Sequence, residues 1–170
     1  MTNRLLGYAS LIALLSMTGP IALAATHASP GLQKIQALAG DWEGKDGDGN
    51  PVKTSFRPIA GDTAVMETLR MSGMEEMVTL YSDDGDGIAL LHYCPTNNQP
   101  RMRAVPGTGE IKELDFNFQG AGNLPDPAIG HEHRLLMQFQ DESHITERWT
   151  WRKNGKDVES VYQFTRKSAN

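Results

Sequence analysis

Short runs in which apolar residues recur at every second position follow one another from residue 40 to the C-terminus. This period of two is typical of β-strands that bury one face. Turn residues such as "DGDGN" at 46–50, "DDGDG" at 83–87 and "KNGK" at 153–156 separate the runs and favour hairpins. Ten strands are predicted, at 40–45, 52–58, 63–71, 75–82, 87–94, 101–105, 110–118, 131–140, 144–152 and 157–166.

One short helix is predicted before the first strand. Ser29 followed by Pro30 has the form of a helix start, and Leu32, Ile35 and Leu38 then recur at helical spacing. The pattern therefore predicts an all-β fold, an antiparallel up-and-down barrel of about ten strands with one short N-terminal helix. A two-sheet sandwich is the alternative, but closure removes the exposed edges that a long meander would present. The one long connection, residues 120–130, is of a length that is usually functional or mobile.

The first residues have the pattern of a signal peptide. Arg4 supplies a charged start, an apolar stretch follows, and Ala22-Leu23-Ala24 has the small-x-small form of a cleavage site. We expect residues 1–24 to be removed, which leaves one domain of 170 − 24 = 146 residues, 25–170. The expected location is periplasmic or secreted, without membrane insertion of the mature chain.

Charge and cysteine content narrow the classes of partner. The chain has 16 Lys+Arg and 21 Asp+Glu, and loss of Arg4 with the signal peptide gives a mature balance of 15 − 21 = −6. An acidic domain without a basic stripe argues against nucleic acid as a partner. Cys94 is the only cysteine, so no disulfide within the chain holds the fold.

The segment "LAGDWEG" at 38–44 resembles the Gly-x-Trp signature of lipocalin-like (calycin-type) barrels. The resemblance implies that Trp42 packs against a basic residue of the last strand, for which Arg166 stands at the expected place. With "LLHYC", "NNQPRM", "GHEH" and "ERWTW", the wider pattern is similar to small secreted bacterial lipocalin-like domains of uncharacterised function. The likeness implies a barrel with an interior pocket and no particular reaction.

Two histidines fall on the apolar phase of one predicted strand. In "GHEHRLLMQF", His131 and His133 alternate in step with Leu135, whereas Glu132 points the other way. We therefore expect both imidazoles to face the interior. The stretch directly follows the long connection.

Other polar residues share apolar phases. Glu147 and Trp149 lie on one face of 144–152, where a carboxylate needs a partner, and His131 or His133 is the expected one; a wet barrel mouth is the alternative. His92 is favoured to face inward, and Glu67 is ambiguous between the two faces.

A metal site is one functional interpretation of these residues. His92, His131 and His133 form a candidate three-histidine set for zinc, with Glu67 or Glu147 as a further ligand, which would suit a metal-dependent hydrolase or lyase. Haem held by one of the histidines is a second cofactor interpretation. The short His-x-His pattern is unspecific, and a hydrogen-bonded core histidine is the common case.

The favoured function is the binding of a small, largely apolar molecule in the barrel interior. The candidate ligand-binding residues are His92, His131 and His133 inside, with Glu67, Glu147 and Trp149 nearby and Arg101 at the rim to meet an anionic group. A metal-dependent enzyme, a haem-binding barrel and a protein-interaction module are the alternatives. Scattered over several strands, the methionines are interpreted as adaptable lining.

Overall fold

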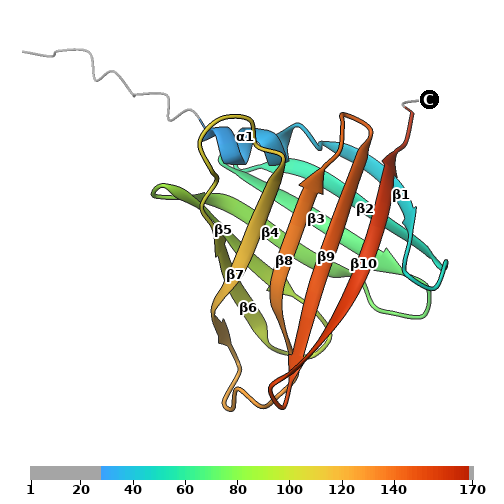
Figure 1. The fold of residues 1–170 in the computed structure, drawn as a ribbon, viewed down its shortest axis with the longest axis vertical. Coiled ribbons are helices and arrows are strands. Elements are labelled where there is room, and N and C mark those ends of the chain that lie inside the picture. The colour runs from blue at the N-terminus through green and yellow to red at the C-terminus, as the bar shows by residue number, and fades with distance from the viewer. Residues whose placement is uncertain (1–27, 169–170) are drawn as a thin grey trace, which may run out of the picture.

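The structure, a computed structural model, describes residues 28–168 and consists of one short helix and ten antiparallel strands (Figure 1). The elements are α1 (Pro30–Gln36), β1 (Gly40–Lys45), β2 (Pro51–Ile59), β3 (Ala64–Met71), β4 (Met77–Asp84), β5 (Gly87–Tyr93), β6 (Gln99–Ala104), β7 (Glu113–Gly122), β8 (His131–Phe139), β9 (His144–Lys153) and β10 (Lys156–Arg166). The expected signal peptide lies outside the described residues. Among these residues, no helix has the length and apolar character needed to cross a membrane.

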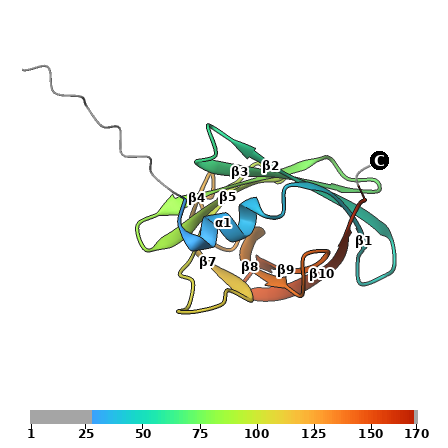
Figure 2. The same ribbon diagram turned by 90° about the horizontal axis from the view of Figure 1, so that it is seen from above.

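Each strand pairs with the next one along the chain, and β1 pairs with β10 to close the barrel. The closing ladder sets Trp42 opposite Arg166 and Gly44 opposite Phe164. Seen from above, α1 lies across one end of the ring of strands (Figure 2). The predicted closed barrel is therefore confirmed, and the sandwich is not formed.

Strand β7 differs from its predicted bounds. It runs to Gly122 because β6 pairs with residues beyond the expected end: Met102 lies opposite Phe118 and Arg101 opposite Gly120. This register leaves Gln119 unpaired as a β-bulge, and Gly120 has a φ of 145°, a conformation that glycine adopts without strain. The long connection is consequently shorter than expected, at residues 123–130.

Helix α1 closes one end of the barrel with its apolar face. The Ser29 side chain caps the helix by accepting a hydrogen bond from the Leu32 backbone N–H, and Pro30 occupies the first turn. Leu32 and Ile35 are fully buried in the same core as the inward side chains of the strands. Burial of two such side chains stabilises the fold by about 3 to 6 kcal/mol.

Arg166 joins the last strand to the chain segment between α1 and β1. Its guanidinium carbon lies 4.3 Å from the centre of the Trp42 ring. Its nitrogens donate to the carbonyl oxygens of Ala37 and Ala39 at 2.7 Å and to that of Glu142 at 2.9 Å. Gly40 has a φ of 127°. The contact implied by the Gly-x-Trp resemblance is thus present, and it supports the closing ladder.

Replacing Arg166 by alanine should lower the free energy of unfolding by about 2 to 4 kcal/mol, because several charge-assisted hydrogen bonds and the contact with Trp42 are lost together. Urea denaturation measures the change. The control is Arg148→Ala, which removes an exposed ion pair with Glu159 and should cost less than about 1 kcal/mol. Equal effects of the two substitutions would contradict the anchoring role of Arg166.

Candidate functional site

The end of the barrel away from α1 contains a cavity of about 550 Å³. Helix α1 contacts the turn that follows β2, where Gln36 donates to the Asp62 carbonyl, whereas the cavity is bordered by the turns that follow β3 and β5. In an up-and-down meander these turns lie at opposite ends. The lining residues are Asp46, Leu69, Met71, Met74, Met77, His92, Cys94, Pro95, Thr96, Glu132, Trp149, Trp151, Val158, Ser160 and Tyr162.

The cavity has two chemically different walls. Strands β3 to β5 and their turns contribute sulfur-containing side chains together with His92. Strands β8 to β10 contribute the aromatic rings of Trp149, Trp151 and Tyr162 together with the carboxyl group of Glu132. The walls approach one another where the imidazole of His92 lies 4.7 Å from the Trp149 ring, measured between ring centres.

A β-bulge in β8 reverses the phase expected for the two histidines. Glu132 lies opposite Trp151, but Arg134 lies opposite Thr150, so His133 is an extra residue between them. Before the bulge the inward position is therefore Glu132, which lines the cavity, and His131 lies opposite Arg152. The prediction that the histidines share the inward phase of Leu135, with Glu132 pointing away, is wrong for this reason.

The two histidines instead form a cluster where the ladder between β7 and β8 stops. That ladder ends at the pair of Asn117 and Arg134. Just beyond it, the ring of Phe118 lies 4.8 Å from each imidazole, and His131 Nε2 is 3.1 Å from His133 Nδ1.

Arg152 completes this cluster. His133 Nε2 lies 2.6 Å from its Nη1, and burial, together with the Arg152 charge, lowers the pKa of His133. His131 is 2 % exposed and contacts the Ile129 carbonyl through Nδ1 at 2.8 Å. The imidazole nitrogens thus have protein partners, which suits a structural role at the place where β7 and β8 separate.

His92 faces inward, as predicted, and is 2 % exposed. Its Nδ1 lies 2.9 Å from the Thr79 hydroxyl, whereas its Nε2 has no hydrogen-bond partner among the described residues. Burial lowers the pKa of His92 to about 4, so the ring is neutral at pH 7. A neutral imidazole with one free nitrogen is therefore available at the cavity wall.

Glu132 is the second polar group of the cavity with a free atom. Its Oε2 is buried and has no partner among the described residues, and burial raises the pKa of Glu132 to about 7. The carboxyl group therefore changes between its protonated and ionised forms near neutral pH. An unpaired buried polar atom costs about 1 to 3 kcal/mol, which a hydrogen bond from a bound molecule would recover.

Glu67 and Glu147 form a buried carboxyl pair across the barrel interior. They project from β3 and β9, are 1 % and 0 % exposed, and lie close enough for each to affect the pKa of the other. Glu67 accepts from the hydroxyls of Thr54 at 2.8 Å and Tyr81 at 2.7 Å, and Glu147 accepts from the Trp149 indole at 3.0 Å. The hydrogen-bond partner of Glu147 is thus the Trp149 indole, where a histidine was expected, and its Oε1 has no partner among the described residues.

Both carboxyl groups have raised pKa values. Burial is the main cause in each case, and the charge of Glu67 adds to the effect on Glu147, whose pKa is well above the ordinary value. Two carboxylates this close in a dry interior do not both ionise at neutral pH, so the pair retains a proton. Tyr81, which donates to Glu67, also has a raised pKa, mainly through burial.

The remaining candidates lie apart from one another. His92 is at the cavity wall, whereas His131 and His133 lie beside Phe118, where β7 and β8 separate. Within residues 28–168, no group of three or more His, Cys, Asp or Glu side chains is placed to hold a metal ion. The three histidines therefore do not form the set considered from the sequence.

Arg101 lies outside the cavity. Because Met102 and Ala104 are buried, the alternation of β6 directs Arg101 to the outer face, where it borders a groove with Leu80 and Gln119. Strand β6 begins at Gln99, two residues before the predicted start at 101, so Arg101 lies within the strand and not at its end. The sequence also did not identify Glu132, Trp151 and Tyr162 as site residues. Simple alternation pointed Glu132 outward because the bulge is not visible in the sequence, and no motif marks Trp151 or Tyr162.

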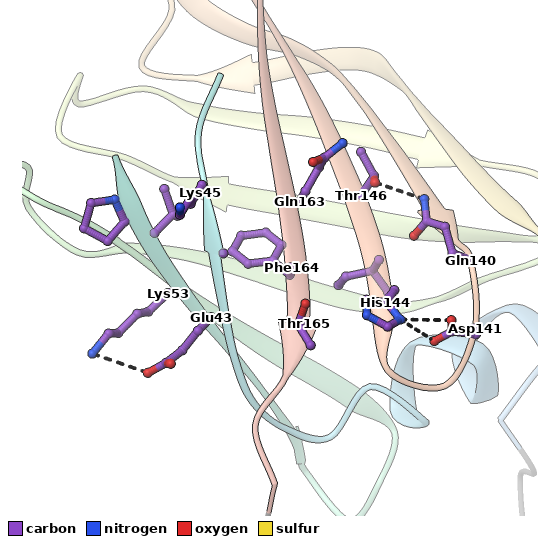
Figure 3. A pocket seen from close by; sticks show the side chains of 14 residues that line it. Glu43, Lys45, Lys53, Gln140, Asp141, His144, Thr146, Gln163, Phe164 and Thr165 are labelled. Atoms are coloured by element: carbon purple, nitrogen blue, oxygen red, sulfur yellow. Dashed lines mark hydrogen bonds and ion pairs between the residues drawn. The ribbon is translucent and has the colours of Figure 1, made fainter. Parts of the chain in front are cut away.

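A larger groove of about 910 Å³ crosses β1, β2, β9 and β10 (Figure 3). Its charged side chains pair locally: Lys53 lies 3.6 Å from Glu43, and His144 lies 2.9 Å from Asp141, with all four well exposed. Exposed pairs of this kind leave no buried polar atom to be satisfied. The interior cavity, with its free atoms, is the stronger candidate site although it is smaller.

The fold and site define a closed antiparallel barrel. An apolar cavity at one end contains a few polar side chains, among them His92 and Glu132. No family model matches the chain, and no curated protein matches its sequence. The barrel is similar to the crystal structure of Rv2717c from M. tuberculosis, with a TM-score of 0.59 and 12 % identity over 84 % of this chain and 100 % of that chain. At this identity the likeness shows the barrel fold alone.

The carboxyl pair predicts a pH dependence of stability. Since the folded barrel favours the protonated forms, it binds more protons than the unfolded chain above pH 4.5, and stability falls as pH rises from there. Glu147→Gln mimics the protonated group and should flatten this dependence by up to about 1.4 kcal/mol per pH unit, the value for one proton. The measurement is urea denaturation from pH 5 to 8.

The comparison with wild type isolates the pair, because His92 and Glu132 titrate in both proteins and cancel in the difference. Glu113→Gln, an exposed residue of β7, is the control and should leave the pH dependence as it is. An unchanged dependence in Glu147→Gln would show that the pair does not retain its proton.

Proposed function

We propose that this chain is a lipocalin-like binding protein that takes a small, largely apolar molecule with one polar group into its cavity. The observation that carries the proposal is that His92 and Glu132, two residues that line one apolar cavity, each have a buried polar atom, Nε2 and Oε2, without a partner among the described residues. Ligand sites combine apolar walls with a few polar groups that fix orientation. A volume of about 550 Å³ is in the range of such sites.

The two polar atoms indicate the kind of group that the ligand carries. Glu132 either accepts or donates a hydrogen bond near neutral pH, because its pKa is about 7. His92 is neutral and presents either a lone pair or an N–H at Nε2, according to its tautomer. A hydroxyl or amine on an apolar body satisfies both. The rings of Trp149, Trp151 and Tyr162 supply a flat apolar wall for that body.

Binding is tested with the neutral fluorescent probe N-phenyl-1-naphthylamine. We expect the wild-type protein to bind it with increased fluorescence and Ser160→Trp to bind at least about tenfold more weakly, because the new indole fills the cavity from an exposed mouth position. Glu159→Trp, one residue earlier and on the other face of β10, is the matched control and should bind as wild type does.

The same preparation identifies the natural occupant. Extraction and mass spectrometry would detect a bound small molecule, and the absorption spectrum would reveal haem. If neither an occupant nor probe binding is found, or if both tryptophan variants bind equally, the binding proposal fails. A protein-interaction module would then be the better interpretation.

We further propose that the chain acts outside the cytoplasm after removal of residues 1–24. The support is the charged start, the apolar stretch and the Ala22-Leu23-Ala24 site in the sequence.

Expression in a Gram-negative host should yield a periplasmic protein whose N-terminal sequence begins at Ala25. Ala24→Asp should block processing, because the cleavage site requires a small residue there. Ala28→Asp is a control that should leave the cleavage unchanged. Cytoplasmic recovery of the uncleaved wild-type chain would contradict the proposal.

A further inference from the structure

Five side chains with soft or imidazole donor atoms line one wall of the cavity. They are Met71, Met74, Met77, Cys94 and His92. From the sequence, the methionines are scattered without a regular spacing. The fold gathers three of them beside the one cysteine and the one inward histidine.

Strand register explains how this wall forms. Met77 lies opposite Leu69, so Met71 is the next inward position of β3. On the other side of β4, Thr79 lies opposite His92 and Val78 opposite Tyr93, so Cys94 follows as the residue level with Met77. Met77 and Cys94 therefore lie level on adjacent strands, with Met71 one inward position nearer the mouth and His92 one inward position deeper in the barrel.

Met74 adds a donor from the turn between β3 and β4. The preceding residue, Gly73, has a φ of 76°, which turns the chain back at the mouth of the cavity. Met74 is 55 % exposed and still borders the cavity.

His92 supplies the nitrogen donor of this wall. The side chain lines the cavity, its Nε2 is buried without a partner among the described residues, and its Nδ1 lies 2.9 Å from the Thr79 hydroxyl. In the tautomer with hydrogen on Nδ1, that nitrogen donates to Thr79 and Nε2 presents a lone pair. This is the usual way in which a protein orients a metal-binding imidazole.

We propose that the sulfur wall, formed by Met71, Met74, Met77, Cys94 and His92, binds one Cu(I) ion. Thioether and thiolate ligands select Cu(I), and imidazole also binds copper well. The Cys94 thiol, whose sulfur lies 2.8 Å from the Thr96 hydroxyl, releases a proton to solvent when it binds the ion as thiolate. The set contains only one His and one Cys, so it differs from the three-histidine site considered above.

This inference does not rest on the binding of an organic molecule. The aromatic wall with Glu132 lies across the cavity from the sulfur wall, and the copper experiment uses no organic ligand. Failure of one proposal therefore leaves the other intact.

The test is an anaerobic titration of the purified full chain with Cu(I) against a chromophoric Cu(I) chelator. We expect one ion per chain, quenching of tryptophan fluorescence through the His92–Trp149 contact, and sulfur scattering in X-ray absorption. The double variant Met71→Leu/Met77→Leu should bind at least tenfold more weakly, because leucine keeps the apolar volume and removes the thioethers.

Two variants keep the result interpretable. Met66→Leu changes a methionine of β3 that lies outside the cavity lining and should leave the affinity unchanged. Met74→Leu, at an exposed turn, should weaken binding without altering the thermal unfolding curve. Binding that is equal in Met66→Leu and in the double variant would show that the methionines of the wall do not hold the ion and would overturn the proposal.

Discussion

Pairing of β1 with β10 closes the sheet, and the interior described above exists only because of that closure. The ladder contains four residue pairs, fewer than the ten that join β9 to β10. Arg166 strengthens this short seam by covering Trp42 and donating to carbonyl oxygens on both sides of it. An open sheet of ten strands would expose two edges, whereas the closed one encloses a space that side chains must fill.

The filling is apolar next to α1 and becomes polar toward the open end. Glu67 and Glu147 lie within the interior, where Thr54 and Tyr81 donate to Glu67 and Trp149 donates to Glu147, whose Oε1 has no partner among the described residues. Nearer the mouth, His92 and Glu132 each retain one buried atom without a partner. A barrel evolved for stability alone would have little use for such atoms, since each costs free energy unless something bonds to it. Their position at a cavity argues for an occupant.

Two β-bulges change the strand pattern, and the one in β8 decides which of its residues reaches this cavity. The bulge in β8 places Glu132 inside. His131 and His133 lie instead beside Phe118 and Arg152, where β7 and β8 separate. The bulge in β7 lengthens that strand and shortens the connection before β8. One inserted residue shifts the alternation by one position, so every inference from phase beyond it is reversed. Each bulge is a single inserted residue, yet the one in β8 determines that a carboxyl group and not an imidazole lines the cavity at that position.

Alternation, turn residues and helix-capping signals in the sequence were enough to predict ten strands, one helix and a closed barrel, because these signals act between near neighbours in the chain. They also placed His92, Glu147 and Trp149 on inward phases, where the structure finds them, and left Glu67 undecided. Partners and distances were decided by tertiary structure. Glu147 meets Glu67 across the barrel, and Met71, Met77 and Cys94 gather on one wall, because closure and register bring distant strands together. The residue pattern of a single strand does not show which residues of distant strands it contacts.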